Sequence, residues 1–493
     1  MKLGLICDSH MPYNDQSSQW HFCLKAAEMF SDKDISRVIT IGDITSFGEI
    51  EAFDAYQKMF SSFEHYCVLG NSDARDKNTA DELAEKCHGF SFFVDGKTVL
   101  GVNTANAGIS EDDKKAISLL SDGDILVMHH PVERLHDEQD RKFMNEICES
   151  KSIIVLYAHL HRKIYSEKGK SKLFGIRAID PDKSFGNFPC VTIFDTDTNE
   201  IEEKLIEVSG KAIHDARKYF GISCVDNHRD VEYATEHKLY GVELRCNGKG
   251  WEPDLSLLPK ISEWRKSGGK YLSVHMPNLY WKDGALVGAE TWYKAVEYAK
   301  IIKADGLTMH PPRVKLCEFN DSESAFLKLY TDAVKIVGTD VCIGIENLHM
   351  TRGETSDADR AFGYIPDEVS YWKNKVAENV GKGYNIGHTL DVGHARNNGY
   401  LASKFPISRW YETLGKEARA YHIHQVIMKE EGLKNHNPIE DWFGPQISYV
   451  SFFYLWEKEL IKHGVIFLEV KGSENFEKSV VAFEKAFGSK EEI

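Results

Sequence analysis

The chain has 493 residues, which is too long for one ordinary domain, so we expect two or three domains. Hydrophobic residues make up 42% of the chain and charged residues 28%, as in a soluble globular protein with an ample core. The net charge of −16 argues against broad, sequence-blind binding of nucleic acid, which needs Lys and Arg facing phosphates, but it leaves open a nuclease whose metals contact the phosphate.

The ten cysteines are scattered without a Cys-x-x-Cys spacing, so the sequence indicates neither a zinc knuckle nor a disulfide framework. Reduced, cytoplasmic conditions are therefore expected. The first strand starts at the N-terminus without a signal-peptide pattern, and no window holds 18 apolar residues. We therefore expect no membrane partner.

Five short apolar runs predict buried strands at 3–7, 38–41, 66–69, 125–128 and 153–157. A polar motif directly follows each run: Asp8-Ser9-His10, Gly42-Asp43, Gly70-Asn71-Ser72-Asp73, His129-His130-Pro131 and Ala158-His159-Leu160-His161. Because strand ends on one edge of a sheet converge, five motifs far apart in sequence are expected to build one site.

The side chains in these motifs are ligand types for a pair of divalent transition metals. The candidate ligands are Asp8, His10, Asp43, Asn71, His129, His159 and His161. An isolated histidine is more often a hydrogen-bonded residue than a ligand, but five motifs in order at five strand ends favour a metal centre. Two such ions activate water and clamp a phosphoryl group, which predicts a phosphoester hydrolase.

The first domain is expected to span residues 1–207. Helical patterns at 19–30 and 49–60 alternate with the strands, and 92–101 resembles a hairpin that turns at Asp95-Gly96. Further strands are expected at 163–166, 191–195 and 201–208. Mixed strands with flanking helices indicate a layered α/β sandwich.

The second domain is expected to span residues 212–493. Eight strand-like runs are predicted at 220–225, 241–245, 271–275, 306–310, 341–346, 385–391, 418–424 and 465–470. Helical stretches separate most of them, for example 289–302, 322–337 and 448–462. Eight strands with interposed helices over this length predict a (β/α)8 barrel.

Acids and histidines lie near the ends of these eight strands and are expected to ring the barrel mouth. They are His275, His310, Glu346, Asp391, His394, His422 or His424, His436 and Glu469. A carboxylate that closes an apolar run is costly in a core unless it is paired or metal-bound. Polar strand ends facing water are the alternative, but so many at matching positions favour a second metal site.

Other residues beyond the strand ends are weaker candidates for substrate binding. Four arginines could recognise a phosphate or carboxylate, or lie in solvated loops: Arg245, Arg313, Arg352 and Arg396. Tyr280 and Trp281 could stack a base or sugar ring, or anchor a loop on the barrel.

On these motifs, the first ~200 residues resemble the calcineurin-like metallophosphoesterase superfamily. The resemblance implies a four-layer α/β/β/α sandwich and two ions, chosen among Mn, Fe, Zn and Ni. One ion would take Asp8, His10, Asp43 and His161; the other would take Asp43, Asn71, His129 and His159. Asp43 and His129 are the expected catalytic residues, and the choice of His129 over His130 rests on the His-x-Pro form of the family motif.

Ser72 departs from the family pattern, and its neighbour Asp73 is expected to have a structural role. Ser72 stands where the family has a histidine that often protonates the leaving group, and a serine cannot supply a proton near pH 7. The site should then favour leaving groups that need little protonation, or draw the acid from another residue. Asp73 is expected to cap the next helix or orient a ligand.

The second half resembles the xylose-isomerase-like barrel superfamily, which includes sugar isomerases, epimerases and endonuclease IV. The four-ligand core implied is Glu346, Asp391, His422 and Glu469, with the two glutamates also catalytic. The extra residues His275, His310, His394 and His436 match positions of the nuclease's three-metal cluster. Lys434 replaces a nuclease aspartate and could itself neutralise a phosphate. One to three Zn or Mn ions are implied.

Three functions follow for the whole chain. The leading hypothesis is a bifunctional fusion with two metal-bearing domains, a metal-dependent phosphodiesterase or phosphatase whose binuclear site hydrolyses a phosphoester and whose barrel acts on the same or a neighbouring bond. The substrate would be a phosphorylated small molecule or nucleic-acid ends. The alternative is a sugar or sugar-phosphate isomerase or epimerase barrel coupled to a phosphatase. A binding role for one half, with a slow barrel, is the third.

Overall fold

The computed structural model describes residues 1–246 and 251–488, which form two compact units. The first unit comprises Met1–Val208 together with Phe443–Ser451, and the second comprises Ser209–Trp442 and Phe452–Ile493. The segment Phe443–Ser451 is held in the first unit by hydrogen bonds. The Ser448 N–H donates to the Asp182 carbonyl at 3.1 Å, and the hydroxyls of Ser184 and Ser448 are 2.8 Å apart.

Two sheets form the centre of the first unit. One runs in the order β11 (Glu200–Leu205), β10 (Cys190–Asp195), β1 (Lys2–Ile6), β2 (Arg37–Ile41) and β3 (Glu64–Val68). The other runs β4 (Phe90–Val94), β5 (Lys97–Val102), β6 (Ile125–Met128), β7 (Ile154–Tyr157), β9 (Ser171–Gly175) and β8 (Ile164–Lys168). The strands β1, β2 and β3 are parallel, as are β5, β6, β7 and β9, so each set points its carboxyl ends in one direction.

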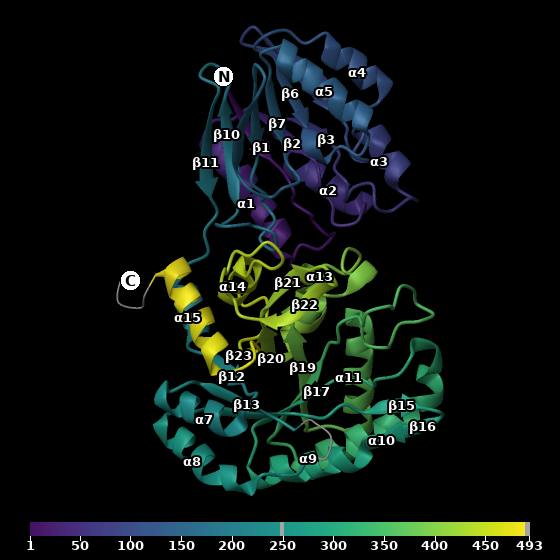
Figure 1. Cartoon of the computed structure of the whole chain (residues 1–493), viewed down its shortest axis with the longest axis vertical. Coiled ribbons are helices and arrows are strands. Elements are labelled where there is room, and N and C mark those ends of the chain that lie inside the picture. The colour runs from purple at the N-terminus through teal and green to yellow at the C-terminus, as the bar shows by residue number, and fades with distance from the viewer. Residues whose placement is uncertain (247–250, 489–493) are drawn as a thin grey trace. The chain divides into compact units, whose positions relative to one another are not determined.

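Helices cover the outer faces of both sheets (Figure 1). They are α1 (Ser18–Asp32), α2 (Ile50–Met59), α3 (Ala80–Lys86), α4 (Glu111–Ser118) and α5 (Glu138–Ser150), with a short 3-10 turn at Val132–Arg134. One buried core lies between the sheets and includes Leu5, Ile39 and Val127, while Met144 of α5 packs in a second core against Leu126 of β6. The four-layer α/β/β/α architecture expected from the resemblance is confirmed.

The second unit is a closed barrel of eight parallel strands, which confirms the predicted (β/α)8 fold. The strands are β12 (Phe220–Ser223), β13 (Gly241–Arg245), β14 (Tyr271–His275), β17 (Gly306–Met309), β18 (Cys342–Glu346), β19 (Asn385–Asp391), β20 (Ala418–Ile423) and β23 (Val465–Leu468). Strand β23 pairs with β12 and closes the barrel.

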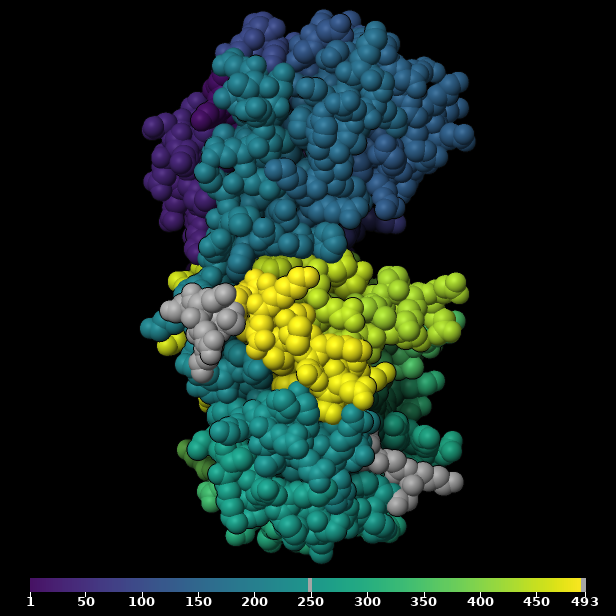
Figure 2. All heavy atoms as spheres, turned by 60° about the vertical axis from the view of Figure 1, so that its left-hand side comes forward, coloured from purple at the N-terminus to yellow at the C-terminus, as the bar shows by residue number. Residues whose placement is uncertain are grey.

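Helices connect and surround the barrel strands. They are α6 (Gly210–Arg217), α7 (Asn227–Glu236), α8 (Leu258–Ser267), α9 (Ala289–Ile301), α10 (Phe319–Val337), α11 (Pro366–Val380), α12 (Val392–Arg396), α13 (Ile407–Leu414), α14 (Val450–Glu457) and α15 (Ser473–Phe487). Short 3-10 turns lie at Leu255–Leu257, Leu316–Glu318, Gly399–Leu401 and Gly415–Glu417. Figure 2 shows the outer surface of α15 in yellow; its inner side buries Phe483 against Phe220 and Trp442.

Two hairpins on the barrel loops were not predicted from the sequence. One pairs β15 (Tyr280–Lys282) with β16 (Ala285–Val287), and the other pairs β21 (Gln425–Lys429) with β22 (Gly432–Asn437). The second hairpin follows β20 directly and carries His436. Throughout the described part of the chain, no helix combines the length and apolarity needed to cross a membrane.

Candidate metal centres

The seven side chains predicted in the first unit come together where the carboxyl ends of strands from both sheets meet. Loops after β1, β2 and β3 contribute one set, and loops after β6 and β7 contribute the other. The potential ligand atoms of Asp8, His10, Asp43 and His161 all lie within 4.8 Å of one another. This is the ligand set that the family resemblance implied for one ion.

Asp43 lies at the centre of the arrangement and faces both sides. Its Oδ2 is 3.1 Å from His10 Nε2, and its Oδ1 is 3.5 Å from His129 Nε2. The two oxygens of one carboxylate thus point toward two different groups of ligands. This is the geometry required of a carboxylate that bridges two ions.

The second group assembles around the amide oxygen of Asn71. This Oδ1 atom is 2.9 Å from His159 Nδ1 and 3.3 Å from His129 Nε2. The Nδ1 of His129 faces the Ile41 carbonyl at 2.9 Å, so a proton there leaves Nε2 free to bind a metal.

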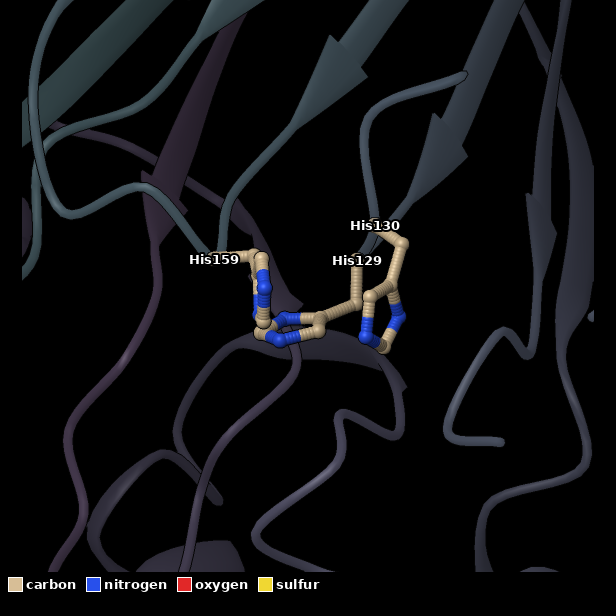
Figure 3. A group of neighbouring side chains, drawn as sticks. All are labelled: His129, His130 and His159. Atoms are coloured by element: carbon tan, nitrogen blue, oxygen red, sulfur yellow. The ribbon is translucent and has the colours of Figure 1, made fainter. Parts of the chain in front are cut away.

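Figure 3 shows the rings of His129, His130 and His159 gathered at the ends of β6 and β7. The ligand atoms of all three lie within 4.8 Å of one another, yet His130 directs Nδ1 toward the Thr104 hydroxyl at 3.3 Å. His129, in contrast, faces both Asp43 and Asn71. The geometry therefore supports the choice of His129 as the ligand in this pair.

The backbone is strained at the positions that supply these ligands. Five of them adopt φ between 41° and 70°, a left-handed region that costs non-glycine residues free energy: Asp8, His10, Asp43, His159 and His161. Neighbouring glycines make room, because a Cβ on Gly70 would lie 2.3 Å from Asp43 Oδ1 and one on Gly42 would lie 2.5 Å from His129 Nδ1. Strain kept at five converging positions is typical of a functional site.

The electrostatics around Asp43, His159 and His161 favour the protonation states that bind metal. Burial alone would raise the pKa of Asp43, but the neighbouring His129 charge and the hydrogen bond from His10 hold that pKa well below its usual value. Burial lowers the pKa of His161 well below its usual value, and burial with the nearby His129 lowers that of His159 to about 4. Both imidazoles are therefore neutral at pH 7, the form that binds a metal. Burial raises the pKa of Asp8 to about 6.

Asp180 orients His10 and was missed by the sequence analysis. Its Oδ2 is 3.2 Å from His10 Nδ1, which leaves His10 Nε2 directed at Asp43. Gln19 of α1 donates from Nε2 to Asp180 at 2.9 Å and to Asp182 at 2.8 Å. A carboxylate that binds the second nitrogen of a ligating histidine fixes its tautomer and orientation.

The loop after β3 holds Ser72 and Asp73 in structural roles. The Ser72 hydroxyl donates to the Thr45 carbonyl at 2.7 Å, and its N–H donates to Asp43 Oδ1 at 2.7 Å. Asp73 accepts the backbone N–H groups of Ile44, Thr45 and Gly70 at 2.8–3.2 Å. Asp73 thus supports the Asp43 loop, and Ser72 has no proton to offer a leaving group.

In the barrel, Glu346 at the end of β18 lies among imidazoles. Its Oε2 is 3.1 Å from His275 Nε2 and 3.2 Å from His310 Nε2, and its Oε1 is 3.0 Å from His422 Nδ1. Burial alone would raise its pKa, yet the charges of His310 and His422 and the hydrogen bonds from His275 and His310 hold the pKa well below its usual value. The ionised carboxylate is therefore the stable form.

His422 brings the four predicted core residues together. Its Nδ1 is also 3.2 Å from Glu469 Oε2 and 4.0 Å from Asp391 Oδ2. Glu469 additionally pairs with Arg245, whose side chain turns into the barrel mouth. Glu346, Asp391, His422 and Glu469 thus converge as the sequence predicted.

A third group is formed by His394, His424 and His436, whose ligand atoms lie within 4.8 Å of one another. His424 Nε2 is 3.2 Å from Asp391 Oδ1. The sequence left His422 and His424 as alternatives, but both reach the mouth: His422 lies near the end of β20, and His424 directly follows the strand and contacts Asp391.

Two residues of the mouth differ from the sequence interpretation. Glu243 on β13 was overlooked, although it is fully buried and its Oε2 lies 2.9 Å from His422 Nε2. Lys434, which the sequence suggested as a group that neutralises a phosphate, pairs its ammonium with Glu431 on the same hairpin at 2.9 Å.

The weaker substrate-binding candidates lie at several places. Arg313 donates from Nε to Asn278 at 3.2 Å, and Arg352 is exposed. Tyr280 and Trp281 lie on β15, where the Trp281 ring packs 6.3 Å from Phe326, in agreement with the alternative of a loop anchor.

Several buried polar atoms in both units lack a hydrogen bond within the described residues. They are Asp8 Oδ1 in the first unit, and Asp391 Oδ2 and His394 Nε2 in the barrel. A buried polar atom without a hydrogen bond costs about 1–3 kcal/mol, so such clusters are rare without a ligand. Oxygen and imidazole donors directed at shared points fit divalent ions.

The first unit also matches a known family. Residues 1–198 match the family model described as the calcineurin-like phosphoesterase superfamily domain. This part of the chain is a calcineurin-like phosphoesterase domain. No curated protein matches the chain.

Solved structures are similar to parts of the chain. A D-tagatose 3-epimerase-like protein is 20% identical, with a TM-score of 0.40, and the match covers 54% of this chain and 96% of that one. D-psicose 3-epimerase in the presence of D-fructose is 11% identical, with a TM-score of 0.35, and the match covers 55% of this chain and 100% of that one. An archaeal phosphodiesterase is 18% identical, with a TM-score of 0.25, and the match covers 42% of this chain and 100% of that one.

Replacing Asp180 with asparagine is expected to weaken Mn²⁺ binding by the phosphoesterase domain by about 10–100-fold, because His10 loses the carboxylate that orients it. Activity titrated against Mn²⁺ concentration measures the effect. Asp182→Asn is the matched control, since Asp182 also binds Gln19 and is buried but makes no contact with His10 in the structure. Equal affinities for the two variants would contradict the role given to Asp180.

Asp182 should make the stability of the phosphoesterase domain depend on pH. Burial, and then the charge of Asp180, raise the pKa of Asp182 to about 7 in the folded chain, against about 3.9 in an unfolded chain. The stabilisation is therefore complete below the unfolded value and is lost as the pH rises through about 7. We expect the Tm to fall more steeply between about pH 4 and pH 7 in the wild type than in Asp182→Asn, because only in this range does the folded state bind more protons than the unfolded state. Parallel Tm curves would refute this.

Proposed function

We propose that the chain is a metal-dependent phosphoester hydrolase, a phosphodiesterase or phosphatase, whose phosphoesterase domain holds two divalent ions. The observation that carries the proposal is the position of Asp43, with one carboxylate oxygen toward His10 and the other toward His129. Mn, Fe, Zn and Ni all suit the donor set.

Each side chain has a defined part in this proposal. When bound, the two metal ions would supply a nucleophile from water and neutralise charge on the phosphoryl group. Asp43 holds the two ligand groups at a fixed spacing, and Asp180 keeps His10 Nε2 aimed at the site. The two neutral imidazoles His159 and His161 remain available as ligands at pH 7.

A cavity beside the second ligand group offers room for a substrate. It has a volume of about 700 Å³ and borders Asn71, His130 and His159. Arg134 and Arg141 line it, so it suits an anionic substrate such as a phosphorylated small molecule or a nucleic-acid end.

The leaving-group preference follows from Ser72, whose hydroxyl is committed to the Thr45 carbonyl. We expect bis-p-nitrophenyl phosphate, whose leaving group needs no protonation, to be hydrolysed with Mn²⁺. A diester with an alkoxide leaving group should react at least about tenfold more slowly, once each rate has been divided by the rate of the same ester without enzyme. Comparable normalised rates would show that another acid serves the site.

For the barrel we propose a second hydrolytic metal centre of one to three Zn or Mn ions, held by the residues at its mouth. The alternative, a sugar or sugar-phosphate isomerase, needs Glu346 and Glu469 as proton-transfer groups. Glu346 lies among three imidazoles and Glu469 is paired with Arg245 and His422, an arrangement that suits metal ligands. The additional group of His394, His424 and His436 favours hydrolysis over isomerisation, because a four-ligand isomerase core does not need it.

The proposed setting is the cytoplasm, where the scattered cysteines would stay reduced. The net charge of −16 supports a substrate recognised at the metal sites over broad binding to nucleic acid.

A further inference from the structure

Two cysteines of the phosphoesterase domain lie in direct contact. Cys67 is on β3, Cys87 caps the end of α3, and their sulfur atoms are 2.7 Å apart as free thiols. The Cys87 thiol also contacts the Cys67 carbonyl oxygen at 3.0 Å. A disulfide bond is about 2.05 Å long, so a small movement would join the two sulfurs.

The two thiols differ in their surroundings. Cys87 is buried, and burial followed by the hydrogen bond with Cys67 raises the pKa of its thiol well above the usual value. Cys67 is only partly buried, and Gln57 donates from Nε2 to its sulfur at 3.4 Å. Because Cys67 is more accessible than Cys87, Cys67 is the thiol that would meet an oxidant first.

We propose that Cys67 and Cys87 form a reversible disulfide when a hydroperoxide oxidises the protein. The Cys67 thiolate attacks the peroxide, forms a sulfenic acid and releases hydroxide or alkoxide. The Cys87 thiol then attacks that sulfur, the S–S bond forms, and water leaves. The two sulfurs together lose two electrons, and one hydroperoxide is reduced.

Helix α3 has the freedom to make this movement. Leu83 is the buried residue of this short helix, all of which the structure describes. The helix also borders a cavity of about 500 Å³, lined in part by Ala80 and Ala84. A loosely packed helix beside open space can shift and can expose Cys87 transiently.

The pair is linked to the candidate metal site through Asn103. Its Nδ2 donates to the Cys87 carbonyl at 2.6 Å, and its Oδ1 accepts the Leu69 N–H at 2.7 Å. Leu69 lies two residues before Asn71. A movement of Cys87 toward Cys67 therefore pulls on the loop that holds the amide oxygen of Asn71.

The effect on turnover rests on the proposed function. With both thiols free, Asn71 Oδ1 lies within 3.3 Å of His129 and His159. Displacement of a ligand by a fraction of an ångström lowers the rate, so oxidation should reduce phosphoesterase turnover several-fold, and a dithiol should restore it.

The test treats the full chain with hydrogen peroxide, alkylates the remaining thiols and maps the peptides by mass spectrometry. We expect a Cys67–Cys87 link that dithiothreitol removes, and slower amide hydrogen exchange over residues 69–87 in the oxidised protein. Cys317→Ser is the matched control, because Cys317 is an exposed cysteine outside this pair and its loss should leave the link intact. If both Cys67 and Cys87 stay fully alkylated while Cys317 is oxidised, the proposal is wrong.

Two variants separate the link from the enzymatic claim. In Cys87→Ser we expect Cys67 to accumulate as a dimedone-reactive sulfenic acid; if this variant does not fold, Cys67→Ser should leave Cys87 reduced under the same peroxide. Ready oxidation of Cys87 in Cys67→Ser would overturn the order of events. If the link forms but the reduced protein has no phosphoesterase activity, the disulfide stands and the proposed function fails.

Discussion

Replacing Asp43 with asparagine is expected to lower Mn²⁺-dependent hydrolysis of bis-p-nitrophenyl phosphate by about a thousandfold, since each tenfold loss corresponds to about 1.4 kcal/mol and a metal centre contributes several kcal/mol. Asparagine keeps the shape of Asp43 but offers only one oxygen, so it cannot face His10 and His129 with two anionic donors. Steady-state rates at saturating Mn²⁺ measure the loss.

Asp34→Asn is the control for this variant. Asp34 shares the left-handed backbone of Asp43, with φ of 54° against 52°, but it is exposed and lies in the loop between α1 and β2. We expect its activity to remain within about twofold of the wild type, as for surface substitutions generally. Full activity in Asp43→Asn would show that the phosphoesterase reaction does not depend on a bridging carboxylate.

Replacing Glu346 with glutamine is expected to release metal from the barrel, with affinity lowered more than about 100-fold, because Glu346 contacts three of the candidate histidine ligands. Elemental analysis of the dialysed protein should show fewer ions per chain, while hydrolysis by the phosphoesterase domain stays unchanged.

Glu417→Gln provides the comparison for the barrel variant. Glu417 precedes β20 at the other end of the barrel and pairs with Lys373, so its loss should leave the metal content intact. Loss of both the barrel metal and the phosphoesterase activity in Glu346→Gln would instead indicate one composite site.

The strand ends of both sites were predictable because each apolar run in the sequence is followed directly by a polar motif. An apolar run such as Ile125–Met128 must be buried, and the histidine that follows it must then emerge at the sheet edge. The same reasoning located Glu346 and Asp391 at the ends of β18 and β19. Parallel strands then bring such residues together without further information.

Residues that support the ligands escaped this reasoning. Asp180 lies in a loop without a strand pattern, and its role depends on contact with His10, which is far away in the sequence. Glu243 lies inside an apolar run; its inward direction follows only once the barrel closes and Thr308 donates to it at 2.7 Å. His436 was a predicted candidate, but the β21–β22 hairpin that brings it to the mouth was missed, because its charged sequence carries no clear strand alternation.

The packing of residues 443–451 within the first unit could not be predicted from the sequence either. This contact depends on side chains such as Ser184 and Ser448, which give no pairing signal of their own. In contrast, the position of His422 and His424 at the barrel mouth was available from the sequence, because both lie at the end of the apolar run that forms β20.

Anomalous diffraction from crystals of the full chain grown with Mn²⁺ tests the central claim most directly. We predict two peaks in the phosphoesterase domain about 3.5–4 Å apart, both in contact with Asp43. One should also contact Asp8, His10 and His161, and the other Asn71, His129 and His159. A single peak, or two peaks that do not share Asp43, would contradict the account.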